Sequence, residues 1–284
     1  MNGTAERAGR RRAWAAVAPA LLWTAAFFVA PFALMVAMSL WRRGDAGIER
    51  VWTFENYRGF FERPAFLEAL ANSLEITLIV TVLSVLLAYP LAALIAYRVP
   101  ARLQRLALAL AVLPFWTSYV VRSYAWSLVL ADKGVLNRAL ADLGLPALEI
   151  AASRAATVTG FVHFFVMLLT LTIYAALRQL PAGYARAAAD LGAGPVTRFR
   201  LIVLPLTLPG VAVGAFLTFV LAMGDYITPQ ILGQGSELTL AQVIMLQLGR
   251  RADLPMAAAL SVILMIAVTL AYLATARWLR LERV

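Results

Sequence analysis

Few side chains in this 284-residue sequence could carry out chemistry, and the most suggestive is a carboxylate beside an aromatic ring. Asp225 and Tyr226 directly follow a long apolar run, and Pro229 comes three residues later. A carboxylate next to an aromatic ring suits an organic ammonium ion, which it can hold by charge pairing and cation–π attraction. These three residues are therefore candidates to line a cation path. Alternatively, Asp225 caps a broken helix or pairs with an arginine such as Arg122.

Arg122 lies in a second candidate segment, LPFWTSYVVRSYAW, and it is the one formal charge inside any of the long apolar runs. Ionisable groups in the middle of a membrane helix cost about 2.5–3.5 kcal/mol, so they face a cavity or a partner. We expect Arg122 to pair with a carboxylate or to lie near the outer mouth of a path. The aromatic residues around it form either an interfacial belt or part of the cation path. They are Trp116, Tyr119, Tyr124 and Trp126.

Other kinds of chemistry find little support in the composition. The sequence has no cysteine and one histidine, His163, which exclude a thiolate or histidine-rich metal site. The apolar runs also hold no cluster of carboxylates, so we predict neither a metal site nor catalytic residues. His163 is expected to be a hydrogen-bonded bundle residue rather than a proton relay. Glu75, at the start of the second apolar run, is expected to be solvated at headgroup level.

Membrane-spanning helices must position these residues, because 62% of the sequence is apolar and only 14% is charged. A bilayer-spanning helix takes about 20 residues, and backbone groups in lipid need hydrogen bonds within the segment. We therefore predict an all-α polytopic membrane protein with six transmembrane helices. The first run is too long for the apolar core of a signal peptide and is expected to remain as a span. The six runs are Trp14–Leu40, Ile76–Tyr97, Leu106–Ala131, Ala155–Leu177, Leu201–Gly224 and Leu254–Ala276.

Arginines define the orientation of these spans. With six spans, both termini and the second and fourth connections lie on one side, and most basic residues fall there. Since positive charge collects on the cytoplasmic side, we predict cytoplasmic N- and C-termini. The net charge of +10 does not indicate nucleic-acid binding, because it is divided among short segments beside the membrane. The arginines concerned are Arg7, Arg10, Arg11, Arg12, Arg98, Arg102, Arg105, Arg178, Arg186, Arg198, Arg200, Arg277, Arg280 and Arg283.

Three connections fall on the opposite, outer side. The first, Trp41–Ser73, is polar and aromatic. Asp132–Arg154 has turn residues at both ends and is expected to contain a short helix. Asp225–Asp253 includes the apolar stretch Leu238–Gly249, which is too short to span a bilayer and is typical of an interfacial or re-entrant segment.

The fourth connection, on the predicted cytoplasmic side, combines small residues with a helix break. Small residues at positions i, i+3, i+4 and i+7 leave one helix face almost without side chains. Gly194 and Pro195 follow and permit a sharp turn, after which we expect a second short helix and then the next span. The pattern fits either an elbow with a docking face or a plain loop. The small residues are Ala185, Ala188, Ala189 and Gly192.

This connection resembles the EAA loop of ABC-importer permeases. The shared pattern is Ala187-Ala188, three residues, Gly192, nine residues and then Ile202-Val203-Leu204-Pro205. The resemblance implies that residues 183–205 dock into a cytoplasmic ATPase subunit. Arg186 stands where the family usually has glutamate, so a salt bridge from that position is in doubt. The implied coupling residues are Ala185, Arg186, Ala187, Ala188, Asp190, Gly192, Ile202, Leu204 and Pro205.

Further stretches between Leu70 and Ala276 resemble spermidine/putrescine-type permeases of the type I importer class. They are LPFWTSYVVRSYAW, KGVLNRAL, MGDYITPQILG and LTLAQVIMLQL. The resemblance implies a type I permease domain over residues 70–276. Residues 1–69 then hold the N-terminus, first span and outer loop, and 277–284 form a cytoplasmic tail.

The resemblance also implies the other parts of a transport complex. We expect an ATPase dimer, a second homologous permease and a periplasmic solute-binding protein, with this chain in the bacterial inner membrane. ATP and magnesium would bind the ATPase, so this chain would hold no cofactor and would not itself be an enzyme. The expected cargo is a polyamine or a similar small solute. A permease for another small polar solute, a self-sufficient secondary transporter and a membrane enzyme are the alternatives.

Overall fold

The computed structural model describes residues 14, 17–45 and 47–279. Within those ranges, five helical segments are long and apolar enough to cross a membrane, and a bent pair of helices makes a sixth candidate. The all-α polytopic prediction is therefore confirmed, with one span of a different shape. The five segments are Val17–Ser39, with η1 (Ala25–Val29) and α2 (Ala30–Ser39); α4 (Pro64–Tyr97); α8 (Arg154–Gln179); Pro195–Gly224, with α10 (Pro195–Arg198), η3 (Phe199–Val203) and α11 (Leu204–Gly224); and Leu254–Thr275 within α13 (Leu254–Leu279).

The predicted third span, Leu106–Ala131, is wrong as a single helix. The chain forms α5 (Ala101–Val112) and η2 (Leu113–Trp116), then turns by 90° into α6 (Tyr119–Leu130) and α7 (Val135–Asp142). Pro114 has no backbone N–H to continue the helix. Its carbonyl instead accepts hydrogen bonds from the backbone N–H (3.3 Å) and the hydroxyl (2.7 Å) of Thr117. These bonds close the chain into a tight turn at the break.

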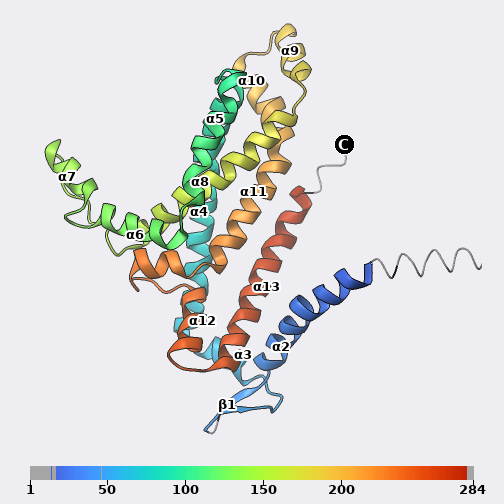
Figure 1. Cartoon of the computed structure of the whole chain (residues 1–284), viewed down its shortest axis with the longest axis vertical. Coiled ribbons are helices and arrows are strands. Elements are labelled where there is room, and N and C mark those ends of the chain that lie inside the picture. The colour runs from blue at the N-terminus through green and yellow to red at the C-terminus, as the bar shows by residue number, and fades with distance from the viewer. Residues whose placement is uncertain (1–13, 15–16, 46, 280–284) are drawn as a thin grey trace, which may run out of the picture.

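Helices α4, α8 and α11 form the centre of the molecule (Figure 1). One apolar cluster joins them through residues such as Ala92, Ile173 and Val211. Helices α8 and α11 approach closely, because a Cβ atom added at Gly214 would lie 2.5 Å from the hydroxyl of Thr172. Small residues at such crossings let helix backbones pack together in a membrane.

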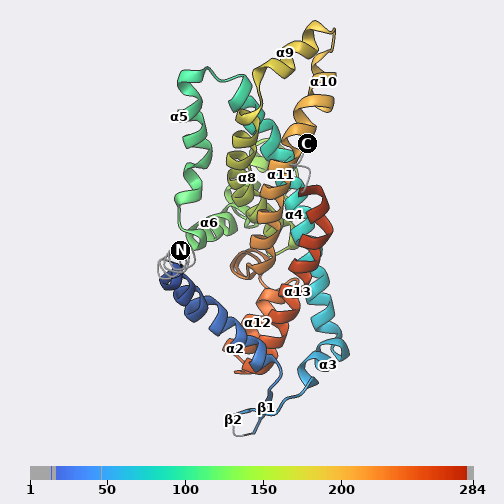
Figure 2. The same cartoon turned by 90° about the vertical axis from the view of Figure 1, so that its right-hand side faces the viewer.

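The end of the molecule opposite α9 is called the outer end, following the predicted orientation. It carries α3 (Glu55–Glu62), η4 (Pro229–Gly233) and α12 (Leu240–Gly249), with a hairpin of β1 (Arg42–Gly44) and β2 (Gly47–Glu49) (Figures 1 and 2). The hairpin pairs Arg42 with Glu49 and was not predicted. The short helix α7 confirms the prediction for the second of these connections. Helix α12 is too short to span a bilayer, as predicted, and its interfacial or re-entrant position stays a prediction.

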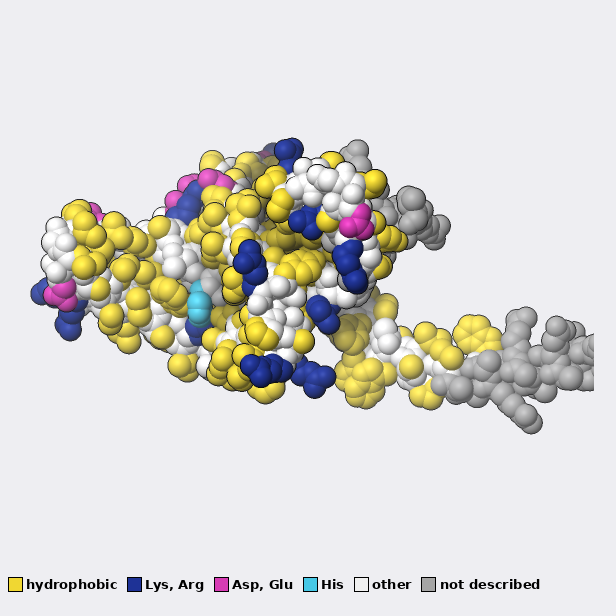
Figure 3. Space-filling model, turned by 90° about the horizontal axis from the view of Figure 1, so that it is seen from above, with side chains coloured by type: hydrophobic (Ala, Val, Ile, Leu, Met, Phe, Trp, Pro, Cys, Tyr) yellow, Lys and Arg dark blue, Asp and Glu magenta, His cyan; other side chains and the backbone are white. Residues whose placement is uncertain are grey.

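Helix α9 (Ala182–Asp190) stands out from the inner end, beside α10 (Figures 1 and 2). Basic side chains surround a largely hydrophobic surface at this end (Figure 3). The ends of α4 and α8, the start of α5 and the α9–η3 segment carry them: Arg98, Arg102, Arg105, Arg178, Arg186, Arg198 and Arg200. These are the arginines on which the predicted orientation rests, and the cytoplasmic side stays a prediction. The N-terminal arginines at 7, 10, 11 and 12, and those at 280 and 283, lie outside the described residues.

Candidate functional sites

A glycine-terminated helix end shapes the elbow at the inner end. The N–H of Gly192 donates to the carbonyl of Ala189, and that of Ala193 donates to Ala188, both at 2.9 Å. This pair of bonds is a Schellman motif, which needs a left-handed residue after the helix. Gly192 supplies it with a φ of +83°. Pro195 then begins α10, so the predicted break at Gly192–Pro195 is confirmed.

The second half of the elbow differs from the prediction. The expected separate short helix runs on through η3 into α11 as one continuous helical segment, Pro195–Gly224. Phe199 lies on this segment and packs edge-on against Tyr89 of α4, with ring centroids 5.6 Å apart. The Tyr89 hydroxyl shares a buried hydrogen bond of 2.8 Å with Thr207 of α11. The elbow is therefore tied directly to two central helices.

Apolar side chains of the elbow point into solvent. Tyr184 is 55% exposed, Leu191 89% and Val196 70%. A cavity of about 650 Å³ lies at its base and is lined by α8, α9 and α11, including Gln179 and Pro205. Large exposed apolar patches on a folded protein mark interaction surfaces. The elbow thus has the character of a docking surface.

The predicted coupling residues divide into two groups by their exposure to solvent. Arg186, Ala187, Asp190, Gly192 and Pro205 are exposed, whereas Ala188, Ile202 and Leu204 are half-buried. Ala185 belongs to α9, and its side chain lies outside the description. The exposed members lie mostly on α9 and its turn, whereas Ile202 and Leu204 belong to η3 and α11; their roles in coupling stay predictions.

The second candidate site lies where α11 ends and the chain turns toward η4. One carboxylate oxygen of Asp225 accepts a hydrogen bond of 2.7 Å from the backbone N–H of Ile227. The other accepts a hydrogen bond from the hydroxyl of Tyr119, which also contacts the hydroxyl of Thr228. Asp225 thus caps the turn after α11, which was the alternative to a role in lining a cation path.

Arg122 is buried near this cluster, and its guanidinium forms a hydrogen bond at the break in the third span. Its guanidinium donates to the carbonyl of Pro114 at 2.8 Å and lies over the rings of Phe164 (4.7 Å) and Tyr119 (5.4 Å). Among the described residues Arg122 forms no ion pair with a carboxylate, so that expectation is wrong, whereas a position near the outer mouth stays a prediction. The guanidinium therefore adds a charged donor to the carbonyl of Pro114, which also accepts the two hydrogen bonds of Thr117.

The remaining aromatic candidates do not join the cluster. Trp116 is 85% exposed and Tyr124 is 58% exposed, while Tyr226 is also exposed and Pro229 is buried. The structure therefore brings together Asp225, Tyr119 and Arg122 from the predicted set. A belt and a path role for the exposed rings both stay predictions.

Comparison with known proteins places the chain in a family. Residues 13–281 match the family described as "Binding-protein-dependent transport system inner membrane component". The chain belongs to this family. It is 35% identical over 235 residues to the inner membrane ABC transporter permease protein YdcU of Escherichia coli K12, covering 78% of this chain and 74% of YdcU. It is 32% identical over 247 residues to the spermidine/putrescine transport system permease protein PotB of the same strain, covering 86% and 89%.

The permease also shares its fold with solved importers. A bacterial alginate ABC transporter, crystallised in complex with an alginate pentasaccharide-bound periplasmic protein, matches with a TM-score of 0.75. The match covers 99% of both chains at 15% sequence identity. This likeness confirms the type I importer permease fold, and the family confirms an inner-membrane component.

Several residues of the permease make contacts that the sequence did not indicate. Arg154 forms ion pairs with Glu75 and Glu237, so the expectation that Glu75 is simply solvated is incomplete. His163 packs edge-on against Trp126, and its Nδ1 is buried without a hydrogen-bond partner, contrary to the expected bonded residue. Within the described part of the chain, no three His, Cys, Asp or Glu residues are grouped to hold a metal ion.

Proposed function

We propose that this chain is the membrane-spanning permease subunit of an ATP-driven importer for polyamines or similar small cationic solutes. A separate ATPase dimer hydrolyses ATP, a second homologous permease completes the path, and a periplasmic binding protein delivers the solute. The polyamine assignment is supported by the 32% identity to PotB along 86% of the chain.

The elbow is the observation that carries the proposal. It projects from the inner end, exposes apolar side chains, and is tied to α4 and α11 through Phe199, Tyr89 and Thr207. Closure of the ATPase dimer displaces such an elbow, and the tied helices move with it. The coupling is mechanical, because packed elements switch between discrete arrangements rather than deform continuously.

The cluster of Asp225, Tyr119 and Arg122 supports a cationic cargo. The buried Arg122 is turned toward a backbone carbonyl and two rings, so its charge is held within the turn of the third span. Exposed aromatic rings, Trp116, Tyr124 and Tyr226, remain available for cation–π attraction. Asp225 has both oxygens engaged in hydrogen bonds and so offers the solute no free ligand atom.

Reconstitution tests the proposal. This chain, the second permease and the ATPase are placed in lipid nanodiscs, and ATP hydrolysis is measured with the binding protein. We expect stimulation by putrescine- or spermidine-loaded binding protein, and none when this chain is left out.

Different results separate the alternatives. Stimulation by another small polar solute, but by neither polyamine, would retain the importer and overturn the cargo. Solute uptake by vesicles that contain this chain alone would identify a self-sufficient transporter and overturn the complex.

A further inference from the structure

Arg154 occupies a position that helix physics does not favour. It is the first residue of α8, directly after Ser153, whose side chain caps the helix by accepting a hydrogen bond from the N–H of Ala156 (3.3 Å). The N-terminus of a helix carries a partial positive charge, so a cation there is repelled. Contacts outside α8 therefore account for the presence of an arginine.

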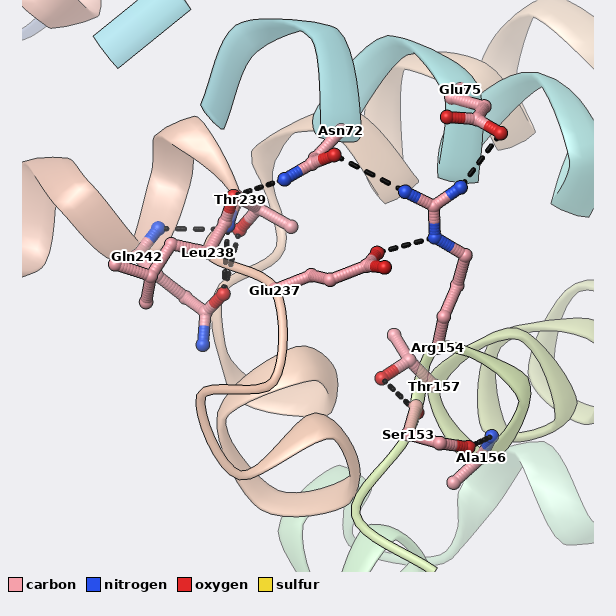
Figure 4. Close-up of polar contacts among 10 residues, drawn as sticks. All are labelled: Asn72, Glu75, Ser153, Arg154, Ala156, Thr157, Glu237, Leu238, Thr239 and Gln242. Carbon is pink, nitrogen blue, oxygen red and sulfur yellow. Dashed lines mark hydrogen bonds and ion pairs between the residues drawn. The ribbon is translucent and has the colours of Figure 1, made fainter. Parts of the chain in front are cut away.

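The guanidinium of Arg154 contacts three side chains from two other parts of the chain (Figure 4). One nitrogen lies 2.6 Å from a carboxylate oxygen of Glu75, and another donates to the amide oxygen of Asn72 at 3.1 Å. Its Nε donates to Glu237, in the connection between η4 and α12. Asn72 and Glu75 lie three residues apart and so share one face of α4.

Hydrogen bonds between side chains of α4 and the backbone of the same connection fasten the two together. The amide of Asn72 donates to the carbonyl of Leu238 (3.4 Å), and the N–H of Leu240 donates to the hydroxyl of Ser73 (2.8 Å). Thr239 and Gln242 then start α12 with reciprocal capping bonds. The polar contacts therefore join the start of α8, one turn of α4 and the start of α12 at a single place, here called the Arg154 node.

The node lies between two separately packed apolar clusters at the outer end. One cluster joins α6, the start of α8 and η4 through Leu130, Ala156 and Leu232. The other joins α3, α4, α12 and α13, with Phe66 and Leu240 among its members. Arg154 belongs to the first group of helices, and its partners on α4 belong to the second.

A third apolar cluster holds the two groups together deeper in the molecule. Ile76 and Val80 of α4 pack there with Phe161 and Phe165 of α8, and Ala222 of α11 completes the cluster. Since Glu75 directly precedes Ile76, the Arg154 node is on the outer side of this packing. If the two groups of helices moved apart at the outer end, the polar contacts of the Arg154 node would break while the deeper apolar packing stayed in place.

The node can open at modest cost because its charges are close to water. Side chains of Arg154, Glu75 and Glu237 are 29%, 56% and 34% exposed. Part-exposed ion pairs contribute little each, and separated charges of this kind regain hydration. The arrangement is suited to a contact that forms and breaks in every transport cycle.

We propose that Arg154 is a positioning residue that latches the outer end of the permease closed. The latch joins Glu75 of α4 and Glu237 of the η4–α12 connection, and it opens when the loaded binding protein docks. This inference rests on the proposed importer function.

Basal ATP hydrolysis in the reconstituted complex tests the latch. In Glu237→Gln and Arg154→Gln, activity without binding protein should rise about two- to fivefold, the shift that loss of one part-exposed ion pair produces. Activity with saturating loaded binding protein should stay near the wild-type value. The double variant should rise no further than either single one, because both changes remove the same contact.

A matched control removes an outer ion pair that joins no two elements. Arg58 and Glu62 pair within α3 at 2.6 Å, and both side chains are largely exposed. Arg58→Gln should leave basal hydrolysis at the wild-type rate. A lower basal rate of ATP hydrolysis in either latch variant, or an unchanged basal rate in Glu237→Gln, would overturn the latch. Damage to folding alone would lower both basal and stimulated activity.

Cross-linking gives a second, independent test. The sequence has no cysteine, so cysteines introduced at Glu75 and Arg154, which join α4 to α8, are the only thiols in this chain. A short reducible cross-linker between them should stop solute uptake, and reduction should restore it. Normal uptake by the fully cross-linked complex would refute the latch. Absence of solute-stimulated hydrolysis in the wild-type complex would instead refute the proposed function.

Discussion

Replacing Gly192 by alanine should weaken attachment of the ATPase subunit, whereas replacing Gly194 should not. A Cβ atom added at either position meets no other atom within 4 Å, so steric contact is the same for both. The difference is the backbone: φ is +83° at Gly192 and −68° at Gly194. An L-residue in the left-handed conformation costs about 1–2 kcal/mol.

This free-energy cost destabilises the backbone conformation that ends α9. A penalty of about 1–2 kcal/mol lowers the population of the docking-competent elbow about 5- to 30-fold. The apparent affinity for the ATPase falls by the same factor, because only this population binds. We expect this loss in a binding titration of purified ATPase against the two permeases in detergent.

Two further variants sharpen the test. Gly192→Asn should lose less affinity than Gly192→Ala, because asparagine tolerates the left-handed conformation better. The melting temperature of the membrane-spanning part should not change, since α9 and its turn at Gly192 stand away from it (Figure 1). Equal affinities for Gly192→Ala and Gly194→Ala would show that the Schellman turn has no part in docking.

Three other changes probe the packing behind the two sites. Gly214→Ala should destabilise the contact with α8 by about 1–3 kcal/mol, measured by thermal unfolding in detergent, while Gly183→Ala, whose added Cβ meets nothing within 4 Å, should not. Arg122→Gln should cost about 1–3 kcal/mol in the same assay, because the carbonyl of Pro114 loses a charged donor. Tyr89→Phe should cost about 1 kcal/mol in stability and reduce the stimulation of ATP hydrolysis, since it removes the bond between α4 and α11 and keeps the ring.

Local features were predictable from the sequence because their causes are local. Hydropathy identified the apolar helices, and Gly192 with Pro195 identified the elbow, since a glycine after a helix and a proline before the next one act within a few residues. The shortness of α12 followed from its count of apolar residues alone.

The errors share one physical cause. Hydropathy measures length and composition, so it could not separate one straight span from the two helices that meet at 90° beside Pro114. The partners of Arg122 and Arg154 depend on which helices meet in space. Arg154 lies 79 residues from Glu75 and 83 from Glu237 in the sequence, and no periodicity connects positions so far apart.

The projecting elbow has a consequence for the life of the protein in the cell. A copy of this permease without its ATPase would hold Leu191 and Val196 in water, 89% and 70% exposed, next to a helix with few other contacts. Exposed apolar segments of this kind promote aggregation and attract cellular proteases. If the elbow docks onto an ATPase as proposed, the same surface would mark an orphan subunit for removal, and subunit numbers would be balanced by degradation.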